Sequence, residues 1–346
     1  MKSTFTYVNQ ESYRLAHIAF VELGEKKLSY DEYDSMATFY KNDFQKFIEY
    51  NVKDVELVIG LEDKMKLIEL AVSLAYSAKV NYMDVFGQVR TWDCIIYHYL
   101  MEHDIVIPPK RINKKDEQYA GAYVKDPIVG MHDWVVSFDL NSLYPHLIMQ
   151  YNISPETKIN QDKDYYITPN SVLGEQSDGF KKALKSHTDK NYSVAANGTC
   201  YTREYQGFLP ALMEKLYKER KMYKKKMIEC QKRQQAGEKN LEKDIAKYNN
   251  FQLVRKIQLN SAYGAIGNEW FRYFNVDMAE AITLSGQLSI RWIADKLNEF
   301  MNKTIGTEDY DYVVASDTDS VYLRLGKLVE KVLNPVSSKK EIVDFL

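Results

Sequence analysis

Apolar positions in the first quarter of the chain recur every three or four residues. The series begins at Phe44, continues through Val55 and reaches Ala71. This spacing collects apolar side chains on one face of a helix. The pattern therefore predicts that residues 31–87 are largely helical.

A short apolar run, partly β-branched, covers residues 134–138 and ends at Asp139. We interpret it as a buried strand, because short apolar runs bounded by turn-forming residues are typical of strands. Asn141 and Ser142 follow at once, and both residue types are common helix caps, so a helix is expected next. Residues 152–206 are polar and rich in turn-forming residues.

Two long helices are predicted in the middle of the chain. Residues 210–235 form a strongly basic helical stretch that is broken near Gly237, and a second helical stretch covers about 241–263. Helices joined by so short a turn pack as an antiparallel hairpin. A further helix is expected over residues 279–302.

Two β-hairpins are also predicted. Asn197 and Gly198 form the dipeptide that favours a tight hairpin turn. Near the end of the chain, apolar residues 312–315 and 321–323 flank the segment 316–320, which reads Ser-Asp-Thr-Asp-Ser. These elements together predict an α+β fold.

Composition limits the classes of protein that the chain can belong to. With 346 residues, 45% of them hydrophobic and 27% charged, the chain has the makeup of a globular protein of about two domains. Its net charge of −2 means that any binding of nucleic acid must depend on a local basic surface. Pro108 and Pro109, followed by the charged run 110–117, mark the best candidate boundary.

Cysteine content and hydropathy give two further expectations. The three cysteines are too few and too scattered for a disulfide framework or a zinc site, and they suit a reducing cytoplasm. The longest apolar stretch, around residues 70–78, is too short to span a membrane, so no membrane partner is expected.

Three aspartates are the main candidates for chemistry. Asp139 ends an apolar strand, where a carboxylate is costly unless it is hydrogen-bonded or paired with a cation. Asp317 and Asp319 lie two residues apart at a hairpin tip and repel each other unless a cation lies between them. Mg²⁺ prefers carboxylates together with substrate phosphates, and two such ions can activate an attacking oxygen and stabilise a leaving one. The alternative is that these residues only build a turn.

Cationic and polar side chains recur along the two central helices. Arg220 and Lys224 are four residues apart and share one helix face. Lys256, Asn260 and Tyr263 form a similar stripe on the second helix. Such stripes could hold a triphosphate and a sugar or base, and the glycine after Tyr263 leaves room for a close approach. The alternative is that the lysine run is only a solvated helix face.

Three segments occur in an order that resembles a known family. They resemble motifs A, B and C of the family B, or polymerase-α-like, DNA polymerases, and the segments between them are most similar to the replicative enzymes of T-even-like bacteriophages. The three segments are residues 137–145 (Ser-Phe-Asp-Leu-Asn-Ser-Leu-Tyr-Pro), 256–264 (Lys-Ile-Gln-Leu-Asn-Ser-Ala-Tyr-Gly) and 317–320 (Asp-Thr-Asp-Ser).

The resemblance implies a two-metal site in the palm domain. Asp139 and Asp319 would bridge two Mg²⁺ ions, with Asp317 as a supporting acid and the backbone of Leu140 touching metal or phosphate. Tyr144 would lie beneath the incoming sugar and exclude a 2′-hydroxyl. The reaction implied is the transfer of a nucleotide from a dNTP to a primer 3′-hydroxyl.

The resemblance also implies roles for the helical hairpin, which would be the fingers domain. Arg220, Lys224 and Lys256 would hold the triphosphate of the incoming nucleotide. Asn260 and Tyr263 would line the nascent base pair.

Four further residues would contact the primer–template DNA. Tyr119 and Gly121 belong to a segment, residues 119–123, that resembles the link between the exonuclease and polymerase domains. Gly264 and Thr318 would contact DNA from motifs B and C.

Tyr50 and Asp54 resemble the third exonuclease motif, Tyr-x-x-x-Asp. No Asp-x-Glu strand and no second exonuclease acid precede them, so proofreading is not expected from this chain. A nuclease that relies on Asp54 is a weaker alternative, because partner acids are missing.

The resemblance divides the chain into five parts and implies complementing chains. No thumb domain and no exonuclease front half are found, so the chain resembles an internal part of a polymerase, either one product of a split gene or a truncated reading frame. Separate chains that supply the other parts are expected, in the cytoplasm of a phage-infected bacterium. The alternative function is a non-catalytic fragment that binds DNA or a partner. The expected parts are an exonuclease remnant (1–66), a helical connecting segment (67–109), the palm with motif A (110–206), the fingers with motif B (207–268) and the palm with motif C (269–346).

Overall fold

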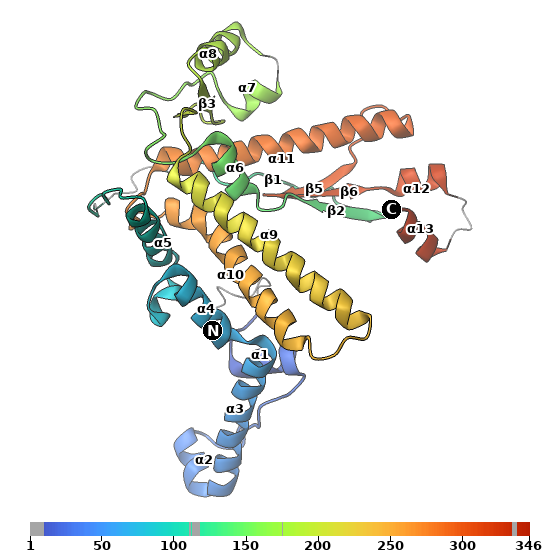
Figure 1. Ribbon diagram of the computed structural model, residues 1–346. Helices are drawn as coiled ribbons and strands as arrows, with labels where there is room; N and C mark the ends of the chain where they lie inside the picture. Colours follow the sequence, from blue (N-terminus) through green and yellow to red (C-terminus); the bar gives the residue numbers. More distant parts are fainter. Residues whose placement is uncertain (1–9, 111, 113–117, 175, 334–337) are drawn as a thin grey trace. The chain divides into compact units, whose positions relative to one another are not determined.

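The computed structural model describes residues 10–110, 112, 118–174, 176–333 and 338–346 (Figure 1). Most of the charged run 110–117, expected as a boundary, lies outside the described residues. The chain divides into two compact units, each made of two separate segments. The first unit contains Met1–Gly87 and Met222–Ile257, and the second contains Gln88–Lys221 and Gln258–Leu346. The five-part division expected from the sequence stays a prediction.

The N-terminal part of the first unit is helical, as its apolar spacing predicted. Side chains of Ser35 and Asp43 accept hydrogen bonds from backbone N–H groups and cap the second and third helices. Lys66, with a φ of 52°, separates the third helix from the fourth. The elements are α1 (Leu15–Leu23), α2 (Met36–Asn42), α3 (Phe44–Met65), α4 (Leu67–Ala78) and the 3₁₀-helix η1 (Tyr82–Phe86).

The outer part of the predicted helical hairpin belongs to this same unit. The hairpin consists of α9 (Phe208–Gln235) and α10 (Glu242–Ile266), whose remaining turns belong to the second unit. The rings of Tyr223 and Phe251 lie 5.1 Å apart, which confirms that the two helices pack together. Val254 of α10 is fully buried in one apolar cluster with Leu70 and Leu74 of α4.

The second unit contains a four-stranded antiparallel sheet in the order β1-β5-β6-β2 (Figure 1). Its apolar face packs on α11 (Val276–Ile305), where Val313, Val321 and Leu323 share a buried cluster with Ile290. The predicted hairpin around residues 316–320 is confirmed as β5 and β6. The strands are β1 (Val124–Lys125), β2 (Val135–Asp139), β5 (Val313–Asp317) and β6 (Ser320–Arg324).

The interpretation of residues 134–138 as a strand is confirmed by β2, but its expected burial is wrong. Strand β2 lies at the edge of the sheet, and Val135 and Phe138 are 44% and 51% exposed. An edge strand has a neighbour on one side only, so apolar residues there are not covered from both sides.

A second core holds the base of the helical hairpin. Buried side chains of α5 (Gln88–Glu102), α6 (Leu143–Tyr151), α9 and α10 meet there, with Trp92, Met213 and Leu259 nearly inaccessible to solvent. The indole N–H of Trp92 donates a hydrogen bond of 3.0 Å to Ser261 Oγ.

The predicted turn at Asn197 and Gly198 is confirmed between β3 (Tyr192–Val194) and β4 (Cys200–Thr202). Gly198 has a φ of 77°, and a Cβ atom there would lie 2.2 Å from the carbonyl oxygen of Asp164, so only glycine fits. The remaining helices are α7 (Pro169–Leu173), α8 (Asp178–Asp189), α12 (Gly326–Val332) and α13 (Lys339–Phe345).

Among the described residues, the helices and two small antiparallel sheets confirm the expected α+β fold class. Among the described residues, no helix combines the length and apolar character needed to cross a membrane.

Candidate functional site

Strand pairing brings two of the candidate acids to the same end of the sheet. Asp139 ends β2 and Asp317 ends β5, and both lie opposite Ser320 of β6. Directly opposed residues of antiparallel strands share a face. Both carboxylates therefore belong to the face of the sheet that does not pack on α11.

The turn between β5 and β6 holds the third acid, Asp319. The turn residue Thr318 has a φ of 51°, and its N–H donates a hydrogen bond of 3.0 Å to the carbonyl of Tyr123. Its hydroxyl donates to Asp317 Oδ1 at 2.9 Å. The N–H of Leu140 donates to the carbonyl of Asp319 at 2.8 Å, which ties the end of β2 to the turn.

The electrostatics at this end of the sheet favour the binding of a cation. Burial, and then the charges of Asp139 and Asp317, raise the pKa of Asp319 above its usual value. A nearby positive charge would stabilise the ionised form of this carboxyl group. Asp139 and Asp317 thus lie close enough for their charges to act on the Asp319 carboxyl group.

The carboxylate oxygens of these acids are compatible with a Mg²⁺ ion whose remaining ligands come from a substrate. Among the described residues, no three His, Cys, Asp or Glu side chains form a group that could hold a metal by itself. Mg²⁺ is commonly held by one or two carboxylates plus substrate phosphates, and carboxylates such as those of Asp139 and Asp319 are chemically compatible with that arrangement.

Tyr144 lies near the acids and belongs to a cluster of three tyrosines. Tyr144 of α6 is half-buried, and burial followed by the charge of Asp319 raises its pKa. Its ring lies 4.9 Å from the ring of Tyr263, whose hydroxyl donates to the hydroxyl of Tyr119 at 3.4 Å. A Cβ atom at Gly286 would lie 3.0 Å from the Tyr144 ring, so α11 comes close to it. Three residues expected to act separately thus form one cluster.

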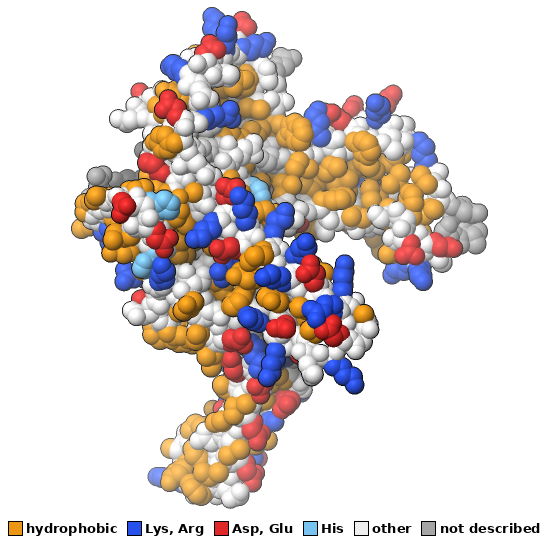
Figure 2. All heavy atoms as spheres, in the orientation of Figure 1, with side chains coloured by type: hydrophobic (Ala, Val, Ile, Leu, Met, Phe, Trp, Pro, Cys, Tyr) orange, Lys and Arg blue, Asp and Glu red, His pale blue; other side chains and the backbone are white. Residues whose placement is uncertain are grey.

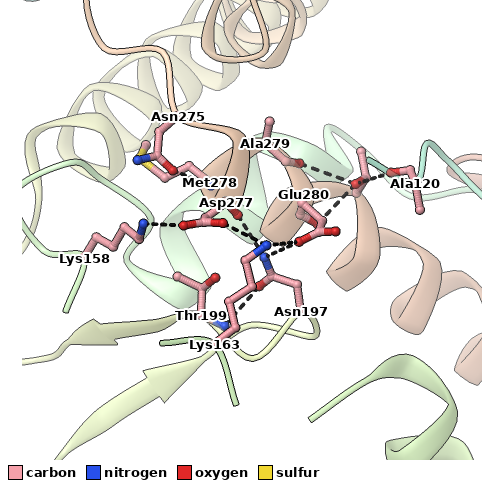
Figure 3. A network of polar contacts seen from close by, with 11 residues as sticks. Ala120, Lys158, Lys163, Asn197, Thr199, Asn275, Asp277, Met278, Ala279 and Glu280 are labelled. Atoms are coloured by element: carbon pink, nitrogen blue, oxygen red, sulfur yellow. Dashed lines mark hydrogen bonds and ion pairs between the residues drawn. The ribbon is translucent and has the colours of Figure 1, made fainter. Parts of the chain in front are cut away.

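The segment containing Tyr119 and Gly121 is fastened to α11. Thr283 Oγ1 donates a hydrogen bond of 2.7 Å to the carbonyl of Ala120. Ala120 is labelled at the right of Figure 3. Gln287 Nε2 donates to the carbonyl of Gly121, also at 2.7 Å.

Gly264 does lie at a close approach, as expected, but to a side chain of this chain. A Cβ atom at Gly264 would lie 2.6 Å from Oε1 of Gln88. A contact of Gly264 with DNA stays a prediction.

Arg220 reaches the helix that follows Asp139. Its Nη1 donates a hydrogen bond of 3.0 Å to Ser142 Oγ. Ser142 is the N-cap residue of α6, as expected. Its φ is 54° and its side chain accepts no capping hydrogen bond, so the expected capping hydrogen bond is wrong. The Ser142 hydroxyl instead accepts the hydrogen bond from the Arg220 guanidinium. One of the cationic side chains predicted to hold a triphosphate therefore lies beside the segment 137–145.

The remaining fingers residues lie on α9 and α10. Asn260 is exposed and belongs to the second unit. Lys224 is exposed and Lys256 is partly buried, and both belong to the first unit. Their expected role at the triphosphate stays a prediction.

Tyr50 and Asp54 lie on α3 with a lysine between them. Lys27 Nζ lies 2.7 Å from Asp54 Oδ2 and 2.8 Å from the Tyr50 hydroxyl. Partial burial works against its charge, but the hydrogen bonds to Asp54 and Tyr50 raise the pKa of Lys27. The charge of Asp54 is thus balanced by an ammonium group.

Sequence reasoning missed the residues that flank the acids on the open face of the sheet. Ser137 pairs with Tyr322, one step along the strands from the pair of Asp139 and Ser320. Tyr322 is 37% exposed. Strand alternation after Ser320 was the signal that could have identified it.

Comparison with known proteins gives a consistent result. A family model described as DNA polymerase family B matches residues 85–343. The DNA-directed DNA polymerase of Escherichia phage RB69 is 34% identical, over 95% of this chain and 40% of that protein. The corresponding protein of Enterobacteria phage T4 is 32% identical, over 99% of this chain and 41% of that protein. A DNA polymerase of Paramecium bursaria Chlorella virus NY2A is 29% identical, over 98% of this chain and 35% of that protein. The chain therefore spans about two fifths of the length of its phage relatives.

Proposed function

The chain belongs to DNA polymerase family B, and on that premise we propose that it is the core of a DNA-directed DNA polymerase. Its reaction would be the transfer of a nucleotide from a dNTP to a primer 3′-hydroxyl. The observation that carries the proposal is that Asp139, Asp317 and Asp319 lie at the same end of the sheet, with Tyr144 beside them.

In this proposal, Asp139 and Asp319 hold two Mg²⁺ ions, supported by Asp317 and the backbone of Leu140. When bound, the ions supply activation of the attacking hydroxyl and stabilisation of the leaving group. The protein's share is positioning and electrostatic stabilisation, because phosphoryl transfer requires no nucleophilic side chain. The pairing of β2 with β6 keeps the carboxylates in place.

The other proposed roles concern the nucleotide and the DNA. Tyr144 packs against the sugar, so that a 2′-hydroxyl is excluded. The proposed triphosphate ligands are Arg220, Lys224 and Lys256, the proposed base-pair contacts are Asn260 and Tyr263, and the proposed DNA contacts are Tyr119, Gly121, Gly264 and Thr318.

The partners in this proposal are primer–template DNA, dNTPs and complementing chains with the exonuclease front half and the thumb. Phage RB69 and T4 relatives at 34% and 32% identity favour the cytoplasm of an infected bacterium as the place of action. Proofreading is not proposed, since the structure pairs Asp54 with Lys27.

Primer extension with Mg²⁺ tests the proposal. The full chain is assayed together with a thumb fragment of the RB69 polymerase, using Asp319→Asn and Asp139→Asn. Each variant is expected to lose about 10³-fold or more in rate, because each acid would contribute several kcal/mol through the ions. Asp295→Asn, an exposed aspartate of α11, is the matched control and is expected to keep the parent rate. Equal rates for Asp319→Asn and parent would refute the two-metal assignment.

The alternative is a fragment that binds primer–template without turnover. A gel shift over a salt series distinguishes the two functions. Binding without nucleotide incorporation, even with the complementing fragment, would support the alternative.

A further inference from the structure

His146 of α6 holds the backbone of Ser142, the residue that caps this helix. The Ser142 carbonyl accepts two hydrogen bonds from His146, one from its backbone N–H at 3.1 Å and one from its ring Nδ1 at 2.9 Å. A carbonyl oxygen only accepts hydrogen bonds, so Nδ1 carries the proton and donates it. A single residue, one turn further along α6, therefore uses both lone pairs of this oxygen.

Ser142 needs such support because its backbone conformation is unfavourable. Its φ of 54° and ψ of 49° lie in the left-handed region, where the Cβ atom of a non-glycine residue is crowded. Such a conformation persists only where the surrounding contacts fix it. The two bonds from His146 fix the carbonyl of Ser142, and the hydroxyl of the same residue is thereby held in place.

Arg220 depends on that hydroxyl for its direction. Its Nη1 donates to Ser142 Oγ at 3.0 Å, and within the part of the chain that the structure describes its Nε is buried with no hydrogen-bond partner. The N-terminus of a helix carries a partial positive charge, so the start of α6 does not attract a guanidinium. The hydrogen bond to Ser142 is therefore what orients Arg220.

His146 also contacts the helix that carries Arg220. Its ring lies 4.5 Å from the ring of Tyr217 with an interplanar angle of 83°, an edge-to-face arrangement in which aromatic rings attract each other. Tyr217 precedes Arg220 by three residues, so the two share one face of α9. The bond between Ser142 and Arg220 is a second contact of α6 with this face, and all four residues belong to the second unit.

The surface that surrounds Arg220 on α9 is cationic. Lys221 and Lys224 follow it and are exposed, and Figure 2 shows Lys and Arg side chains gathered over α9. A guanidinium binds phosphate best when its planar set of donors faces the phosphate oxygens. The affinity of this surface for a triphosphate therefore depends on the direction of Arg220 as well as on its charge.

We propose that His146 is a positioning residue for the incoming nucleotide. By holding Ser142 and packing on Tyr217, it orients the Arg220 guanidinium toward the triphosphate. This inference rests on the proposed function, in which Arg220 is a triphosphate ligand. His146 acts on the substrate only through Arg220, so its replacement should weaken nucleotide binding without slowing the chemical step.

Primer extension over a series of dNTP concentrations tests the proposal, with the full chain and the thumb fragment of the RB69 polymerase. His146→Phe keeps a ring against Tyr217 but removes the Nδ1 donor, whereas His146→Asn keeps an N–H donor near the same position. A hydrogen bond to a charged group corresponds to about 10–100-fold in affinity, and poor orientation loses part of it. His146→Phe should therefore raise the KM for dNTP about 5–20-fold with kcat within about threefold, and His146→Asn should stay within about threefold of the parent KM.

A double-mutant cycle with Arg220→Gln separates positioning from a purely structural role. If His146 acts through Arg220, adding His146→Phe to Arg220→Gln should change the KM by less than about twofold, whereas independent structural losses would multiply. The matched control is His103→Phe. It removes the same kind of contact, between Nδ1 and the Tyr99 carbonyl at 2.7 Å, at an exposed position just after α5, and it should keep the parent KM.

Far-UV circular dichroism establishes that each variant is folded, and His146→Leu replaces His146→Phe if that variant is not. An active parent whose KM is unchanged by His146→Phe, or losses that multiply in the double variant, would overturn this inference alone. Absence of extension by the parent is instead a failure of the proposed function. Equilibrium dialysis of labelled dATP with Mg²⁺ then compares the nucleotide affinity of the parent and of His146→Phe without DNA or thumb, and equal affinity or no binding would overturn the inference as well.

Discussion

Asp277 at the start of α11 is the centre of a network whose removal should destabilise the second unit. Its carboxylate accepts from Lys158 Nζ at 2.5 Å and lies 2.8 Å from Lys163 Nζ, as Figure 3 shows. Lys163 also pairs with Glu280 at 2.7 Å, and Asn197 Nδ2 donates to the carbonyl of Asp277 at 2.9 Å. These bonds fasten the segment before β3, and the β3–β4 turn, to α11. The perturbation is Asp277→Asn, which keeps the shape and removes the charge.

The expected cost lies between those of exposed and buried pairs. The Asp277, Lys158 and Lys163 side chains are 30%, 23% and 27% exposed. Exposed pairs contribute about 0.2–1 kcal/mol, and breaking a fully buried pair costs about 3–5 kcal/mol. Asp277 also lies in the first turn of α11, where a negative charge stabilises the helix by about 0.3–1 kcal/mol. Together these terms give about 2 kcal/mol, which corresponds to a Tm lower by about 4–8 °C for a unit of this size.

Thermal unfolding followed by circular dichroism measures this effect. The matched control is Glu299→Gln, which breaks the exposed pair of Lys296 and Glu299, with side chains 50% and 64% exposed. The control should change the Tm by less than about 2 °C. If Asp277→Asn changed the Tm no more than the control, the network would have no share in stability.

The pH dependence gives an independent check. Burial opposes ionisation, but the hydrogen bonds from Lys158 and Lys163 prevail and lower the pKa of Asp277 below its ordinary 3.8. A carboxyl group with a depressed folded-state pKa stabilises the fold above its unfolded-state pKa and loses that contribution as the pH falls through the folded value. The difference in Tm between parent and Asp277→Asn should therefore be constant near neutral pH and should disappear below about pH 4.

Three further outcomes are expected. Gly198→Ala should lower the free energy of unfolding by about 1–3 kcal/mol or more in denaturant titrations, because its φ of 77° is strained for alanine and its Cβ would meet Asp164. Cys200 should resist iodoacetamide at pH 8 until the chain unfolds, because it is 1% exposed and burial raises its pKa to about 11; rapid labelling of native protein, followed by mass spectrometry, would contradict this. Tyr144→Ala should raise ribonucleotide relative to deoxyribonucleotide incorporation by about 10–200-fold in single-turnover assays, and an unchanged ratio would remove Tyr144 from sugar selection.

Local pattern was enough to predict most elements and the meeting of the acids. Apolar spacing predicted α3, and long helical stretches on either side of Gly237 predicted α9 and α10. The two aspartates flanking Thr318 required only a hairpin, and Asp139 required only a strand ending beside it. Those expectations depend on neighbours in sequence or on one strand pairing.

Features that depend on strand order or on distant contacts could not be predicted. The exposure of Phe138 follows from the edge position of β2, which no local pattern reveals. The bond between Arg220 and Ser142 joins residues far apart in the sequence. The ion pair of Lys27 with Asp54 depends on how α3 and the segment before it pack. In each case the partner is chosen by tertiary structure.

Burial of Val254 against Leu70 and Leu74 has a consequence for how the protein is made. The first 87 residues leave the ribosome well before the segment 222–257 that completes their unit. Until that segment emerges, α4 has an uncovered apolar face in the nascent chain. Closing contacts separated by about 180 positions is slow, so completion of the first unit should be a late step in biogenesis.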